Sequence, residues 1–203
     1  PSAEELKKAV YDFHVQGCQV AIHAVDHEAV QVAAEAIGEA NRLKIGASLR
    51  HRIEHCSECS AECIDVIRAS GGIVVTHPGF IYHSGEKYIA EIDAGVHSQI
   101  YPIASLSKAG VLLASGSDAP VSAPNPVIDI YSAVTRKTAN GRVLSPDQAV
   151  TIDQGLALWT LGSAYSCFRE GSLGSIKAGK LADLVLLSHD PYSAGEKLKD
   201  IKV

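Results

Sequence analysis

The chain has 203 residues, a formal net charge of −5 at pH 7, 46% hydrophobic residues and 20% charged residues. This balance is ordinary for a soluble globular protein and excludes a disordered chain. The absence of any run of about 18 apolar residues excludes a membrane-spanning helix, and mild acidity without a Lys/Arg cluster argues against a nucleic-acid partner.

The first residues predict a helix that begins at the start of the chain. Ser2 followed by Glu5 is a capping box, and the sequence contains no Met. We therefore expect the chain to be the C-terminal portion of a larger protein. The sequence contains five cysteines: Cys18, Cys56, Cys59, Cys63 and Cys167. Because their number is odd and the first residues do not have the pattern of a secretory leader, we expect free thiols and a cytoplasmic location.

The next hundred residues alternate apolar runs with helical stretches. Strands are predicted at 19–23, 49–55, 72–76 and 111–115, with helices after Asp26, at 61–69 and at 103–109. A long loop is expected between the third strand and the last of these helices, and a stiff, proline-rich loop at 120–126. This rhythm predicts an α/β fold with a parallel sheet built from βα units.

The last quarter of the chain has a different pattern. A helical stretch is predicted from Pro146 to Tyr165, followed by short β runs at 174–176 and 181–187. These two parts suggest a main domain over 1–165 and strands of a smaller β domain over 166–203. Four βα units are half of a (β/α)8 barrel, although an open doubly wound sheet is an alternative. Because a half barrel has open sheet edges, we expect a missing N-terminal half or self-association.

Metal-ligating side chains end all four predicted strands. They are His23, His55, His77 and Asp118. Ligands and catalytic groups gather at the carboxyl ends of parallel strands, and three imidazoles with one carboxylate suit Zn²⁺. A bound metal would lower the pKa of water towards about 7 and so generate hydroxide, with Asp118 accepting its proton.

Several motifs resemble the amidohydrolase-3 family of the metal-dependent amidohydrolase superfamily. They are His23-Ala24-Val25, Arg52-Ile53-Glu54-His55, Gly116-Ser117-Asp118-Ala119-Pro120-Val121, Ala133-Val134-Thr135-Arg136 and the run from Gly174 to Val185. The resemblance spans residues 19–191. It implies the C-terminal half, strands 5–8, of a (β/α)8 barrel with part of a small composite β-sandwich domain.

The resemblance also implies an activity and a set of roles. The activity is hydrolysis of carbon–nitrogen bonds in non-peptide or cyclic amides of a small-molecule substrate. His23 and His55 would be ligands of a divalent metal, zinc, present as one or two ions, and Asp118 the general base and a further ligand. His77 stands where the family has Gln, so it is assigned to the substrate, with His83 and His97 in the loop that follows. The superfamily's first-strand His-x-His pair is absent, so we expect the isolated chain to be inactive.

A cysteine cluster supports a competing hypothesis. Cys56, Cys59 and Cys63 form a C-x2-C-x3-C pattern whose thiolates could hold a metal. In this alternative the chain is a non-catalytic metal-binding or interaction module. The cysteines could equally be small buried apolar residues at the start of a helix.

Overall fold

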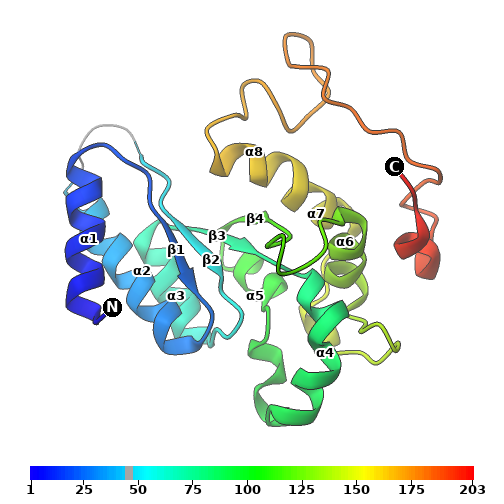
Figure 1. The fold of residues 1–203 in the computed structure, drawn as a ribbon, viewed down its shortest axis with the longest axis horizontal. Coiled ribbons are helices and arrows are strands. Elements are labelled where there is room, and N and C mark those ends of the chain that lie inside the picture. The colour runs from blue at the N-terminus through cyan, green and yellow to red at the C-terminus, as the bar shows by residue number, and fades with distance from the viewer. Residues whose placement is uncertain (44–47) are drawn as a thin grey trace. The chain divides into compact units, whose positions relative to one another are not determined.

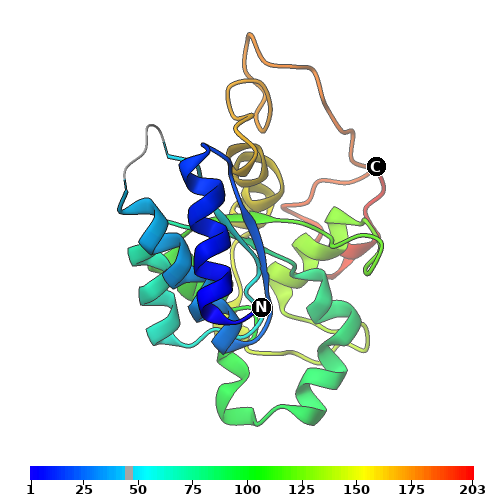
Figure 2. The ribbon, with the colours of Figure 1, turned by 60° about the vertical axis from the view of Figure 1, so that its left-hand side comes forward.

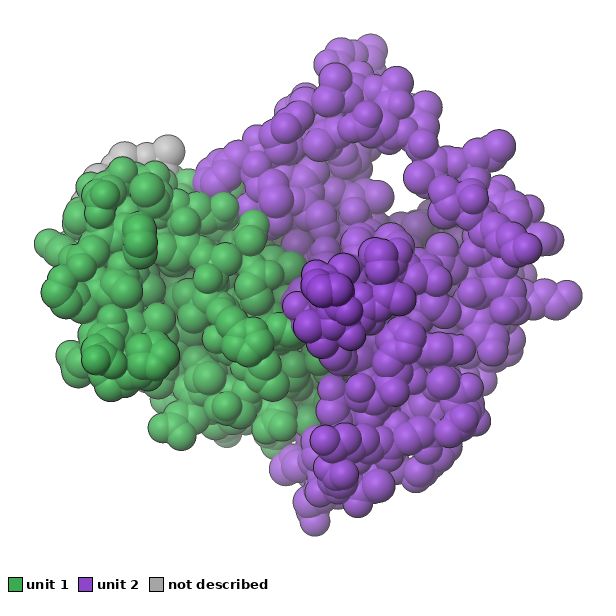
Figure 3. All heavy atoms as spheres, viewed as in Figure 1, with its two compact units in different colours: residues 1–76, 99–113 green, residues 77–98, 114–203 purple. Residues whose placement is uncertain are grey.

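The computed structural model describes residues 1–43 and 48–203 and divides the chain into two compact units. Unit 1 comprises residues 1–76 and 99–113, and unit 2 comprises residues 77–98 and 114–203 (Figure 3). Each unit has its own cluster of buried apolar side chains. The sequence-based division at residue 165 is not tested by these units and stays a prediction.

A parallel sheet carries the predicted strands. Its order is β1 (Ala21–Ala24), β2 (Arg52–His55), β3 (Ile73–Thr76) and β4 (Leu112–Ser115). The first pair is parallel, with Ala21 opposite Arg52, and so is the second, with Arg52 opposite Ile73. The prediction of an α/β fold with a parallel sheet is therefore confirmed, with strands shorter than the apolar runs that indicated them.

Three long helices of unit 1 pack beside one another, with α2 between α1 and α3 (Figures 1 and 2). Helix α1 (Ala3–Val15) begins with the predicted capping box, in which Ser2 and Glu5 bond each other's backbone N–H groups. Helix α2 (His27–Asn41) is capped by Asp26, and α3 (Ala61–Ser70) ends at Gly71 with φ +71°. A shorter helix, α5 (Ile103–Lys108), packs against α3.

Unit 2 is built around two helices that pack against each other, α4 (Gly79–Glu91) and α6 (Pro126–Thr135). Further helical segments follow: η1 (Ala94–Gln99), η2 (Pro146–Gln148), α7 (Ile152–Ala157), the π-helical η3 (Leu158–Gly162), α8 (Ser163–Ser166) and η4 (Gly195–Asp200). The core of this unit comprises Val127, Ile130, Tyr131, Leu198 and Ile201.

Two segments predicted as loops contain helices. The loop after β3 includes the whole of α4, whose start is hidden in sequence by Pro78 and Gly79. The proline-rich loop ends at Pro126, which is the first residue of α6. Proline fits the first turn of a helix because the N–H that it lacks has no intrahelical partner there. Pro126 is therefore both the last residue of the proline-rich loop and the first residue of α6.

The tail after α8 differs from its prediction. Residues 166–203 are all described and contain no strand, so the β runs expected at 174–176 and 181–187 are irregular segments. Ile176 is 87% exposed and Leu186 is 89% exposed. A strand needs a neighbouring strand that is hydrogen-bonded along its length, whereas these runs have isolated backbone bonds, such as that from Leu181 N–H to the Ser172 carbonyl oxygen at 2.9 Å.

No helix in the described ranges is both long and apolar enough to cross a membrane.

Candidate functional site

The two histidines that end neighbouring strands lie against each other in unit 1. The ring centroids of His23 and His55 are 4.6 Å apart, and the rings meet edge to face. The parallel register explains the contact, because His23 stands opposite Glu54 and Ala24 stands opposite His55. The structure therefore brings together the two residues predicted as metal ligands in β1 and β2. His23 is exposed, whereas His55 is buried.

The backbone at the end of β2 adopts an uncommon conformation. His55 has φ +73° and the next residue, Cys56, has φ +53°. Non-glycine residues in this left-handed region carry a conformational cost, and such residues cluster at functional sites. The other face of the strand is neutralised locally, since Arg52 Nε lies 2.8 Å from Glu54 Oε1. The polar residues of this strand are thus of two kinds: Arg52 and Glu54 form an ion pair with each other, and His55 lies at the carboxyl end.

Two more of the predicted site residues belong to unit 2. The Nδ1 of His77 lies 2.7 Å from the carbonyl oxygen of Gly116. Because a carbonyl only accepts, Nδ1 carries the proton and donates it, which leaves Nε2 as the basic nitrogen of the neutral ring. Asp118 follows two residues after Gly116, is partly exposed and has φ +59°. The hydrogen bond from His77 to Gly116 thus anchors the loop that contains Asp118.

The remaining histidines assigned to the substrate lie elsewhere in unit 2. His83 is exposed on α4, with its ring against that of Tyr82 at 5.3 Å. His97 is in η1, and its Nε2 donates to the carbonyl oxygen of Ile92 at 3.0 Å. The assignment of His83 and His97 to the substrate stays a prediction.

The three cysteines of the C-x2-C-x3-C pattern are packed into the core of unit 1. Cys56 is fully buried, and Cys59 and Cys63 are each 1% exposed. The Cys56 thiol and burial raise the pKa of Cys59, and the Cys59 thiol and burial raise the pKa of Cys63. All three cysteines belong to the apolar core cluster of unit 1, and within the described residues they are not placed as a group that could hold a metal ion. The buried apolar interpretation therefore accounts for these residues.

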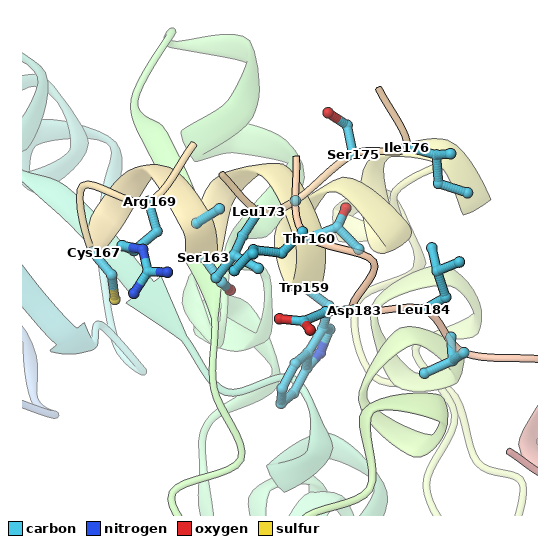
Figure 4. A pocket seen from close by; sticks show the side chains of 14 residues that line it. Trp159, Thr160, Ser163, Cys167, Arg169, Leu173, Ser175, Ile176, Asp183 and Leu184 are labelled. Carbon is cyan, nitrogen blue, oxygen red and sulfur yellow. The ribbon is translucent and has the colours of Figure 1, made fainter. Parts of the chain in front are cut away.

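A hollow in unit 2 contains none of the predicted site residues. It has a volume of about 580 Å³ and lies between the η3–α8 segment and the tail (Figure 4). Its lining is mainly apolar, and Arg169 and Asp183 are its charged side chains. Because the covering tail forms no strand, we assign this hollow no role in catalysis.

The donor groups fit a divalent metal only in part. The pair His23 and His55 supplies two imidazole nitrogens, which are good ligands for Zn²⁺ and similar ions. Within residues 1–43 and 48–203, no group of three or more His, Cys, Asp or Glu side chains is placed to hold a metal ion. The assignment of His23 and His55 as metal ligands stays a prediction.

Two buried polar groups were missed by sequence reasoning. His14 on α1 and His51 before β2 form a hydrogen-bonded pair, although 37 residues separate them. Asp129, in the middle of α6, is 2% exposed. A signal for Asp129 was its place between the apolar residues Ile128 and Ile130, but the proline-rich segment was not predicted to be helical. Nothing local in the sequence pairs His14 with His51.

Comparison with known sequences gives a match along the entire chain. A sequence model described as the amidohydrolase family matches residues 1–203. The chain is 31% identical over 203 residues to the N-substituted formamide deformylase of Arthrobacter pascens. That alignment covers 97% of this chain but 37% of the deformylase.

Comparison of folds gives the same partial coverage. A metal-dependent hydrolase from Pyrococcus horikoshii, described as uncharacterized, superposes with a TM-score of 0.82 at 25% identity. A second such hydrolase, from Pyrococcus furiosus, has a TM-score of 0.78 at 26% identity. The matches cover 97% and 95% of this chain, and 39% and 38% of those chains. The chain thus spans less than half the length of these similar proteins.

Proposed function

Because the chain belongs to the amidohydrolase family, we propose that it is part of a metal-dependent hydrolase that cleaves carbon–nitrogen bonds in non-peptide amides. The observation that carries this proposal is the contact between His23 and His55 at the ends of neighbouring parallel strands, with ring centroids 4.6 Å apart. Two imidazoles at that edge suit a divalent metal, for which zinc is our proposal. The likeness to an N-substituted formamide deformylase suggests N-substituted formamides as the first substrates to test.

The roles follow from the chemistry of each side chain. His23 and His55 would hold the metal, which when bound supplies Lewis-acid activation of water and of the amide carbonyl. The carboxylate of Asp118 accepts a proton from the attacking water and gives it to the leaving nitrogen, so that an amine departs. His77, with Nδ1 bonded to Gly116, presents its basic Nε2 as an acceptor for the substrate.

The metal assignment can be tested on the chain itself. We would measure zinc by mass spectrometry in the wild type, in His23→Ala/His55→Ala and in Cys56→Ala/Cys59→Ala. Loss of zinc only in the histidine variant supports the proposal, whereas loss only in the cysteine variant contradicts it. Unfolding curves of all three proteins separate loss of a ligand from loss of the fold.

A non-catalytic module that holds a metal through Cys56, Cys59 and Cys63 is the second candidate. It is the less favoured one, because the three cysteines are packed in the apolar core of unit 1 and, within the described residues, form no group placed to hold a metal ion. The same zinc measurement decides between the two candidates.

A further inference from the structure

A carboxyl group is buried without a partner in the core of unit 2. The side chain of Asp129 is 2% exposed, and its Oδ2 atom has no hydrogen-bond partner among the described residues. Its neighbours along α6, Ile128 and Ile130, are apolar and buried. Burial of a carboxyl without a partner is costly, and burial alone raises the pKa of Asp129 to about 7. A purely structural position would be served better by an apolar side chain.

The Asp129 carboxyl lies against the first residue of α4. A Cβ atom placed on Gly79 would lie 2.0 Å from Asp129 Oδ1, so any side chain at position 79 would displace the carboxyl. Glycine is thus required here by the close approach of a group from another helix.

The first turn of α4 lacks a cap from its own sequence. Its N-cap residue is Pro78, which makes no side-chain hydrogen bond, whereas α6 is capped by Asn125. The first N–H groups of a helix have no partners within the helix, so an acceptor oxygen is favourable there. The Asp129 carboxyl from α6 lies against this uncapped turn, at Gly79.

The same turn carries a residue of the candidate site. His77 precedes Pro78, and its Nδ1–H donates to the carbonyl oxygen of Gly116 at 2.7 Å. Gly116 in turn stands two residues before Asp118. Asp129 thus contacts Gly79, which is two residues after His77 in the chain. His77 in turn is hydrogen-bonded to the loop that contains Asp118.

We propose that Asp129 is a positioning residue, which fixes the His77-Pro78-Gly79 turn and thereby holds the His77 ring as a donor to Gly116. The positioning rests on contacts inside unit 2. Only the purpose of the turn, which is to present His77 to a substrate, rests on the proposed function.

The experiment is a long-range ¹H–¹⁵N NMR measurement of the His77 ring at pH 8, assigned with a His77→Gln variant. The wild type is expected to show a single Nδ1–H tautomer, as the bond to Gly116 requires. Asp129→Ala is expected to lose that single tautomer. Asp129→Asn, which keeps the size and shape of the side chain against Gly79, is expected to retain it.

Substitution at Gly79 provides an independent arm. Gly79→Ala is expected to reproduce the loss, because the new methyl group takes the position of the carboxyl. Adding Gly79→Ala to Asp129→Ala is expected to cause little further loss of stability, because the methyl group then fills vacated space. Gly85→Ala, on the same helix as Gly79, is the matched control. Its new Cβ would lie 2.6 Å from Cγ2 of Thr138, and the change should leave the His77 signal unchanged.

An unchanged His77 tautomer in Asp129→Ala would overturn the proposal. If that variant does not fold, the double variant Gly79→Ala/Asp129→Ala takes its place, and an unchanged tautomer in it has the same meaning. None of these readouts needs enzyme activity. Failure of the proposed function would instead appear as no amide hydrolysis by a complete wild-type enzyme, while the His77 tautomer still depends on Asp129.

Discussion

The Nδ1 atom of His14 lies 2.8 Å from the Nε2 atom of His51, and both side chains are buried. The backbone N–H of Val20 donates to His51 Nδ1 at 3.1 Å, so the proton of a neutral His51 must be on Nε2. That proton is donated to His14 Nδ1, which leaves the proton of a neutral His14 on Nε2. Within the described residues, His14 Nε2 has no hydrogen-bond partner. The pair is therefore complete only while both rings are uncharged.

This arrangement predicts that the protein loses stability in mild acid. Burial and the neighbouring His14 lower the pKa of His51 from 6.5 to about 4. The unfolded chain therefore binds more protons between pH 6.5 and pH 4, and the free energy of unfolding falls as the pH drops through that range. The loss from this group is at most about 3 kcal/mol. Urea unfolding at several pH values measures it.

A variant that cannot titrate separates this pair from other groups. His51→Gln is expected to unfold more easily at pH 8 but with a shallower pH dependence between pH 6.5 and pH 4. His189→Gln, at an exposed position in the tail, is expected to leave the dependence as it is in the wild type. An equal slope in His51→Gln and the wild type would contradict the prediction.

The cysteine cluster is expected to contribute to stability. Cys63 is 1% exposed within the unit 1 core, so Cys63→Ser places a more polar hydroxyl among apolar groups. We expect a loss of about 1–3 kcal/mol in the free energy of unfolding. Cys167→Ser, at an exposed position, is the control and should cost little. Equal unfolding midpoints for the two variants would show that the Cys63 site tolerates polarity.

The parts of the fold that local patterns specify could be predicted from the sequence. The β-branched run at Ile73–Thr76 forms β3, and the Ser2 and Asp26 caps begin α1 and α2. The contact between His23 and His55 also followed, because parallel strands place their carboxyl ends at one edge.

What could not be predicted depends on contacts between distant segments. The start of α4 carries Pro78 and Gly79, which indicate a loop, it has no side-chain cap, and the carboxyl of Asp129 from α6 packs against Gly79. The tail run 181–187 has the composition of a strand but is not part of a sheet among the described residues. Local sequence patterns do not reveal either feature, because each depends on contacts with distant segments.

Asp129 predicts a pH dependence of the opposite sign to that of His51. Its pKa is about 7 in the folded protein because of burial, against 3.8 for an unperturbed aspartate. The folded protein therefore retains a proton that the unfolded chain releases, so this group's contribution to stability is complete below pH 3.8 and is lost as the pH rises to 7. The span corresponds to at most about 4 kcal/mol.

The comparison of Asp129→Asn with the wild type isolates that contribution. The amide has the shape of the protonated acid and does not titrate, so the two proteins should have similar stability at pH 4. At pH 8 the variant is expected to be more stable, by up to about 4 kcal/mol. Chemical unfolding at both pH values measures the difference. A constant difference at the two pH values would show that Asp129 does not titrate in the folded state.

Asp118 is expected to be required for turnover and dispensable for folding. It is partly exposed on the loop that His77 holds through Gly116, so Asp118→Asn changes a charge without opening a cavity. Loss of a general base lowers kcat by a factor of about 10²–10⁴. The measurement is hydrolysis of an N-substituted formamide by a complete enzyme that includes this chain, with unfolding curves for both proteins. His189→Gln, at an exposed position in the tail, is the control for loss of an exposed polar group. If Asp118→Asn kept more than a tenth of the wild-type kcat, another group would have to accept the proton of the attacking water.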